Sequence, residues 1–231
     1  MSDKYLRRSY TILFLSLLIT LIVAPIAAEY QLRTGPIELL LIVNLAVAAA
    51  GYGTRRGRHR LLAVVLLIAL LRIVGKWFNV ETFSAGARAL SVVLAFLAAA
   101  AALRFALRGG KVNAEKVGAA LSAYLLAGHC FGIAYFQVNQ LRPGSFSIGG
   151  APTTPLQLDL QTAIYFSFVT LATLGYGDIL PLTPTARGLA VSEAILGQLY
   201  LAVLVARLVG RRDPDNNADE ALSQRHEQTS I

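Results

Sequence analysis

The sequence contains six apolar runs that are each long enough, or nearly so, to cross a membrane. Crossing the roughly 30 Å hydrocarbon core of a bilayer as a helix takes about 20 residues. The runs are residues 11–28, 37–52, 61–78, 87–107, 117–138 and 185–209. Only 15% of the 231 residues are charged, whereas soluble domains carry about 25%. The sequence therefore predicts an all-α membrane protein with six transmembrane helices.

A seventh apolar stretch, residues 158–172, is too short to cross the membrane. It follows a segment rich in Gly, Pro, Ser and Thr, a composition typical of a loop. Asp159 is placed to cap a short helix by accepting a hydrogen bond from a backbone N–H group. We therefore expect a re-entrant helix that enters from outside, a loop at membrane depth, and then the last transmembrane helix.

The net charge of +8 is concentrated in alternate loops. Basic residues precede the first run, fill the loops between runs two and three and between runs four and five, and follow the sixth run. Because cytoplasmic loops carry an excess of Lys and Arg, both termini are expected in the cytoplasm, as in a multi-pass protein of the cell (inner) membrane. The charge thus indicates topology and contact with anionic membrane lipids rather than a nucleic-acid partner.

The first run has a second interpretation. Its basic start, its apolar stretch and the following Ala-Pro-Ile-Ala-Ala-Glu-Tyr are compatible with a cleaved signal peptide. The apolar stretch is long for a signal peptide, and the small-residue cleavage pattern is imperfect. A membrane helix is therefore the favoured interpretation, and the topology of the later helices is the same in either case.

The sequence lacks the motifs of an enzyme. Cys130 is the single cysteine, which excludes an intramolecular disulfide. The sequence contains no Cys/His metal-binding cluster, no phosphate-binding glycine loop and no nucleophile triad. We therefore predict no enzymatic activity, no organic cofactor and no small-molecule substrate.

The triplet Gly-Tyr-Gly occurs twice, in different settings. At residues 51–53 it ends the second apolar run and is followed by Thr54 and a cluster of arginines, which favours an ordinary helix end at the membrane interface. At residues 175–177 it follows the short helix, with Thr173 before it and Asp178 after it. Irregular backbone at membrane depth is tolerated only where it is buried in protein or lines a watery cavity. The second triplet therefore indicates a transport pathway.

The residues around the second triplet suit a cation that sheds its water. Backbone carbonyls replace a hydration shell when successive residues aim them at one axis, and Gly175 and Gly177 tolerate the left-handed torsions that this requires. The Thr173 hydroxyl adds an oxygen at the inner end. Asp178 places negative charge at the outer mouth, which raises the local cation concentration. Tyr176 is expected to point away from the axis and brace the loop.

Residues 170–178, Thr-Leu-Ala-Thr-Leu-Gly-Tyr-Gly-Asp, resemble the selectivity filter of the tetrameric potassium-channel family. The resemblance covers about residues 117–209. It implies a homotetramer, because one chain offers ligands on one side only. It also implies that K⁺ is coordinated by the Thr173 hydroxyl and by the carbonyls of Thr173, Leu174, Gly175 and Tyr176. The residues expected to support the filter are Thr170, Gly177, Asp178 and Tyr165.

The sequence departs from the family pattern near the filter. Leu174 stands where many members have Val, and Val169 stands where some have Glu. Tyr165 and Phe166 replace a common pair of tryptophans, although the Tyr165 hydroxyl is still able to donate a hydrogen bond to Asp178. These departures concern the rigidity of the filter and slow inactivation rather than selectivity.

The last apolar run carries the candidate gate. Gly197 lies at the position of the gating glycine in the family, but a glycine in a membrane helix also permits close packing, and the sequence does not decide between hinge and packing. A spacing of i, i+3 and i+7 places three side chains toward the ion path: Gln198, Leu201 and Val205. Glu193 is a functional candidate as an acid within a membrane span, with a hydrogen bond to the short helix as an equal alternative.

The first four runs lack the pattern of a voltage sensor. Such a sensor needs several cations at every third position, but the fourth run has Arg88 at one end, Arg104 and Arg108 at the other, and no cation between them. We divide the chain into an N-terminal membrane domain (1–112), a pore domain (113–210) and a short cytoplasmic tail (211–231) that is expected to be disordered.

These observations predict a homotetrameric, potassium-selective channel that conducts passively. A nonselective cation channel is an alternative with the same architecture. A transporter-type subunit is a second alternative, although such proteins resemble four degenerate filter repeats in one chain. A non-conducting membrane scaffold is a third, but it leaves the complete filter motif unexplained.

Overall fold

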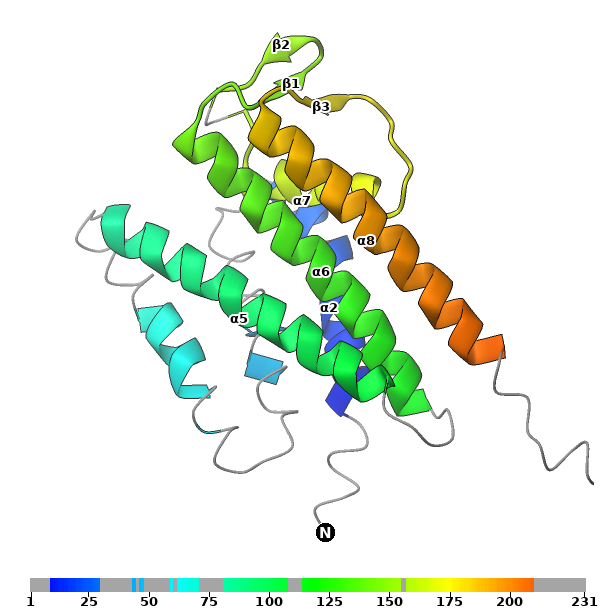
Figure 1. Cartoon of the computed structure of the whole chain (residues 1–231). Helices are drawn as coiled ribbons and strands as arrows, with labels where there is room; N and C mark the ends of the chain where they lie inside the picture. Colours follow the sequence, from blue (N-terminus) through cyan, green and yellow to red (C-terminus); the bar gives the residue numbers. More distant parts are fainter. Residues whose placement is uncertain are drawn as a thin grey trace, which may run out of the picture.

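The computed structural model describes residues 9–29, 43–44, 46–47, 59, 62–70, 81–107, 114–154 and 157–209. The chain there is mostly helical (Figure 1), with helices α2 (Ser9–Glu29), α5 (Glu81–Leu107), α6 (Ala114–Leu141), α7 (Leu160–Leu171) and α8 (Pro184–Val209). Residues 62–70 are also helical. Within this part of the chain, three helices are long and apolar enough to cross a membrane: Leu90–Leu107, Ala114–Leu141 and Pro184–Arg207.

The last three predicted membrane runs coincide with α5, α6 and α8. Helix α5 begins at Glu81, six residues before the predicted start, so that Gly86 lies inside it. Helix α8 begins at Pro184, where the missing N–H group of proline costs nothing because the first turn has no intrahelical partner for it. The first predicted run forms α2, which contains the shorter apolar helix Tyr10–Ile26.

Several predictions concern residues outside the described part of the chain. They include the second apolar run apart from residues 43–44 and 46–47, the ends of the third run, the first Gly-Tyr-Gly triplet and the tail after residue 209. The six-helix count therefore stays a prediction.

Helix α6 is the central helix of the described structure (Figure 1), in contact with α2, α5, α7 and α8. One core cluster joins α2 to α6 through Leu13, Leu17, Leu125 and Leu126. Helix α8 differs from α6 because large apolar side chains are exposed along most of its length, among them Val191, Ile195, Leu199 and Val203. A helix that is apolar on all sides requires cover from lipid or from other protein.

The expectation of an all-α protein was wrong in one respect. A small antiparallel sheet, in the order β2-β1-β3, consists of β1 (Phe146–Ile148), β2 (Ala151–Pro152) and β3 (Ile179–Pro181). Strands β1 and β2 are joined by Gly149 and Gly150, with φ of 59° and 86°, and the tightest hairpin turns require positive φ at both central residues. Ile148 pairs with Ile179, so the sheet joins the loop before α7 to the chain that leaves the second Gly-Tyr-Gly triplet.

Candidate functional site

Helix α7 leads into the candidate site. Its first turn is capped as the sequence predicts, because the Thr162 N–H group donates a hydrogen bond of 2.7 Å to Asp159 Oδ1. The helix ends at Leu171, and two residues later Thr173 adopts a left-handed backbone. We call residues 173–177 the filter segment, and we name its Thr173 end the inner end and its Gly177 end the outer end, after the orientation predicted from the sequence.

The backbone torsion φ alternates in sign along the filter segment. The φ angle is 57° at Thr173, 58° at Gly175 and 76° at Gly177, while Leu174 and Tyr176 between them keep negative values. Alternating right- and left-handed residues turn successive N–H groups to one side of the chain. The carbonyl groups are therefore left on the other side.

Thr173 is the one non-glycine residue with positive φ in the described part of the chain. A left-handed backbone costs an L-residue roughly 1–2 kcal/mol, and a β-branched side chain is seldom found there. Such a conformation persists only where the surrounding structure imposes it, and it is found mainly at functional sites. The strain thus marks the inner end of the filter segment as a specialised position.

The N–H groups of the first three residues of the filter segment are bound by α7. The Thr173 N–H group donates to the Thr170 carbonyl at 3.0 Å, and those of Leu174 and Gly175 both donate to the Val169 carbonyl, at 2.9 and 3.4 Å. Thr170 and Val169 therefore support the segment through their backbone oxygens. That the carbonyls of the segment face away from α7 and coordinate a cation stays a prediction.

The outer end of the filter segment is tied to α7 and to the sheet. Tyr165 Oη donates a hydrogen bond of 2.8 Å to Asp178 Oδ2, as expected from the sequence. The Gly149 N–H group donates to the Asp178 carbonyl at 3.4 Å. Because Ile179 then pairs with Ile148, the exit from the segment has a fixed direction.

Glu193 of α8 lies behind α7 and is fully buried. Tyr135 Oη donates to its Oε2 at 2.5 Å, and Ser167 Oγ forms a short hydrogen bond with its Oε1. Ser167 Oγ also lies 2.7 Å from the Gly128 carbonyl. The hydrogen bond to the short helix, one of the two alternatives for Glu193, is therefore present.

The proton count around Ser167 favours a neutral Glu193. A serine hydroxyl has one proton to donate, but here it faces two oxygens, those of Gly128 and Glu193. Both contacts are hydrogen bonds if the Glu193 carboxyl is protonated on Oε1. Its O–H group then donates to Ser167 Oγ, and the Ser167 hydroxyl donates to the Gly128 carbonyl. A continuous series of hydrogen bonds then connects helices α6, α7 and α8.

Three glycines allow these helices to approach closely. A Cβ atom on Gly128 would lie 2.6 Å from the ring of Phe168, and one on Gly132 would lie 2.6 Å from Ile164 Cα. Gly128 and Gly132 have the Gly-x-x-x-Gly spacing of close helix contacts in membranes, a signal that is visible in the sequence but was not among the predicted features. Gly197 is buried against the end of α7, which favours the packing interpretation of that residue.

Three of the four candidate gate residues share one exposed face of α8, and the fourth, Gly197, is buried. Gln198 Nε2 donates to Thr173 Oγ1 at 3.1 Å, so this face begins at the inner end of the filter segment. Leu201 and Val205 follow at i+3 and i+7 and are 40% and 56% exposed in the single chain. That these three side chains line an ion path stays a prediction.

Comparison with known proteins identifies the same region. Residues 121–211 match the family model described as ion channel. The two pore potassium channel c of Oryza sativa subsp. japonica is 35% identical over 86 residues, which are 37% of this chain and 17% of the relative. The inward rectifier potassium channel Kirbac3.1 of Paramagnetospirillum magnetotacticum is 34% identical over 92 residues, 38% of this chain and 26% of the relative.

The voltage-gated potassium channel Kch of Escherichia coli (strain K12) is 41% identical over 51 residues, 22% of this chain and 12% of the relative. The chain thus matches between 12% and 26% of the length of these three relatives. No solved structure matches the chain. The residues matched by the family model include α7, the filter segment and all of α8, and this part of the chain is similar to ion channels, among them the three potassium channels named above.

Proposed function

We propose that the protein is a potassium-selective channel that conducts K⁺ passively as a homotetramer. The observation that carries this proposal is the alternating sign of φ along residues 173–177, with the N–H groups of residues 173–175 bound by carbonyls of α7. One such segment offers oxygens on one side, so that several copies around an axis are needed to surround an ion. Four chains, as the family resemblance implies, would close the ring.

Exposed large side chains in the filter segment support an assembly of several chains. Leu174 is 56% exposed and Tyr176 is 66% exposed in the single chain. Apolar surface removed from water contributes about 25 cal/mol per Å². Neighbouring chains would cover these side chains as well as part of the apolar surface of α8.

In the proposed mechanism, oxygen atoms of the protein replace the water molecules around K⁺ step by step. K⁺ loses its hydration shell to the Thr173 hydroxyl and to the carbonyls of Thr173, Leu174, Gly175 and Tyr176, and several adjacent sites let ions pass in file. Asp178 attracts cations to the outer mouth, and Tyr165 holds its carboxylate in place. Leu201 and Val205 form the inner constriction in this proposal.

The proposed topology is a multi-pass protein of the inner membrane with six helices and both termini in the cytoplasm. The alternation of basic and non-basic loops supports it. The short helix α7 then enters from the outer side, and the inner ends of α6 and α8 lie on the cytoplasmic side.

Ion flux into liposomes tests the proposal. Purified protein is reconstituted with K⁺ or Na⁺ as the only permeant cation, and the mass of the complex in detergent is measured in parallel. We expect a complex of four chains and rapid flux of K⁺ but not of Na⁺. Equal flux of both ions would identify a nonselective channel, and a stable complex without flux would identify a scaffold.

A further inference from the structure

A long apolar cavity lies beside the contact between helix α5 and the candidate pore helices α6 and α8. It has a volume of about 440 Å³ and lies between α5, α6 and α8. Small side chains create it, because alanines face it from α6 at positions 120, 123 and 127 and from α5 at 99, 100 and 106. Phe96 and Leu199 on its walls are more than half exposed, so the cavity opens toward the surroundings of the chain.

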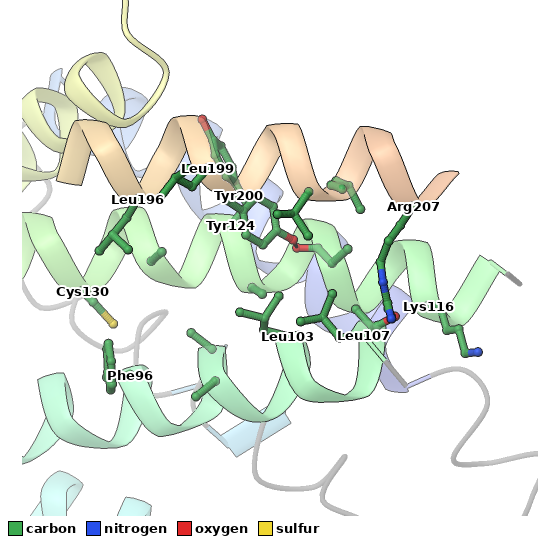
Figure 2. A pocket seen from close by; sticks show the side chains of 18 of the residues that line it. Phe96, Leu103, Leu107, Lys116, Tyr124, Cys130, Leu196, Leu199, Tyr200 and Arg207 are labelled. Atoms are coloured by element: carbon green, nitrogen blue, oxygen red, sulfur yellow. Dashed lines mark hydrogen bonds between the residues drawn. The ribbon is translucent and has the colours of Figure 1, made fainter. Parts of the chain in front are cut away.

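The two ends of the cavity differ in chemistry. Figure 2 shows Lys116 and Arg207 at one end and Phe96 and Cys130 at the other. Arg207 Nη1 donates one hydrogen bond to the Ala106 carbonyl at 3.3 Å, which fixes the guanidinium beside the last turn of α5. A guanidinium has five N–H donors, so others remain for an anion.

Two occupants of the cavity can be compared, a helix from a neighbouring chain and a single hydrocarbon chain, and the shape of the cavity favours the second. The cavity extends along α6 from Lys116 to Cys130, about 21 Å at a rise of ~1.5 Å per residue. A helix from a neighbouring chain is about 10 Å wide with its side chains and would need a groove of that width along the whole ~21 Å. A single hydrocarbon chain is thin enough to occupy its whole length.

We propose that this cavity binds one acyl chain of an anionic phospholipid, with the lipid phosphate held between Lys116 and Arg207. In the proposed topology these two cations lie at the cytoplasmic surface, where basic pockets between membrane helices bind anionic head groups. The bound acyl chain would contact both α5 and α8, and α8 is the helix that carries Gln198, Leu201 and Val205. The binding site itself does not depend on conduction, because it is defined by the cavity and its two cations.

Lipid binding by native mass spectrometry tests this site without measuring ion flux. The purified oligomer is titrated with phosphatidylglycerol and, separately, with phosphatidylcholine that has the same acyl chains. We expect tighter binding of the anionic lipid. Because each basic residue near a membrane surface contributes about 1 kcal/mol to anion binding, Lys116→Gln and Arg207→Gln should each weaken phosphatidylglycerol binding about fivefold. Arg142→Gln, outside the cavity, is the matched control and should change nothing.

A second pair of variants tests the acyl-chain part of the site. Ala100→Leu fills the cavity and should reduce binding of phosphatidylglycerol, whereas Ala101→Leu, at the next residue and outside the lining, should not. Equal affinity of the wild-type protein for both lipids would overturn the proposal. So would competition by inorganic phosphate at the lipid's own concentration, because it would indicate an anion site without a chain site.

Discussion

A Cβ atom added to Gly197 would lie 2.5 Å from the carbonyl oxygen of Leu171, so α8 touches the end of α7 through bare backbone. Such an approach is closer than any side chain tolerates. Gln198, the next residue, binds the Thr173 hydroxyl. The contact at Gly197 therefore sets the position of α8 relative to the inner end of the filter segment.

Gly197→Ala should destabilise the protein because the new methyl group collides with backbone that has no room to move. Overpacking of this kind costs about 1–3 kcal/mol. The matched control is Gly188→Ala on the same helix, where no atom lies within 4 Å of a built Cβ. We expect a lower thermal unfolding midpoint for the first variant only. Equal midpoints for both variants would contradict the close contact.

Glu193→Gln should be tolerated if the buried carboxyl is neutral. A glutamine amide donates to Ser167 and its oxygen accepts from Tyr135, which reproduces the bonds of a protonated glutamic acid. Glu193→Ala removes both groups and leaves the buried Tyr135 hydroxyl without its acceptor, at a cost of about 1–3 kcal/mol. Thermal unfolding in detergent would rank the variants. A loss in Glu193→Gln as large as that in Glu193→Ala would argue for an ionised Glu193.

Tyr165→Phe should loosen the outer end of the filter segment while leaving the fold intact. The variant removes the hydrogen bond that joins Tyr165 of α7 to the Asp178 carboxylate just after the filter segment. We expect shorter open periods in single-channel recordings with little change in K⁺ over Na⁺ selectivity. Asp178→Asn keeps an acceptor for Tyr165 and is the companion variant. Unchanged open periods in Tyr165→Phe would show that this hydrogen bond does not steady the filter.

The fourth predicted membrane helix should move little charge. Replacing Arg88, Arg104 and Arg108 with glutamine removes the basic residues at both of its ends. A charge that crosses the field contributes about 2.3 kcal/mol per 100 mV, so a working sensor would lose much of its steepness. We expect the slope of open probability against voltage to stay the same. A clearly shallower slope would reveal a sensor in this helix.

The helices and the filter segment were predictable because their signals are local. Apolar runs located α5, α6 and α8, and Gly175 and Gly177 indicated the left-handed torsions that the structure contains there. The positive φ of Thr173 was not predicted. The sheet was missed because its strands are two or three residues long, although Gly149-Gly150 is a hairpin signal. The partners of Glu193 come from α6 and α7, and no spacing in the sequence brings Tyr135 and Ser167 to one carboxyl group.

Reversal potentials under opposed K⁺ and Na⁺ gradients test the central claim most directly. Gly177 has φ of 76°, a region that costs a residue with a Cβ atom about 1–2 kcal/mol. Gly177→Ala should therefore turn the Tyr176 carbonyl away from its neighbours in every chain. Gly53→Ala, in the other Gly-Tyr-Gly triplet, is the control and should affect only a helix end.

We predict a reversal potential near the K⁺ equilibrium value for the wild-type protein and for Gly53→Ala. For Gly177→Ala we predict either a potential close to zero or no current. A wild-type potential near zero, or the same shift in both variants, would contradict the assignment of residues 173–177 as a potassium filter.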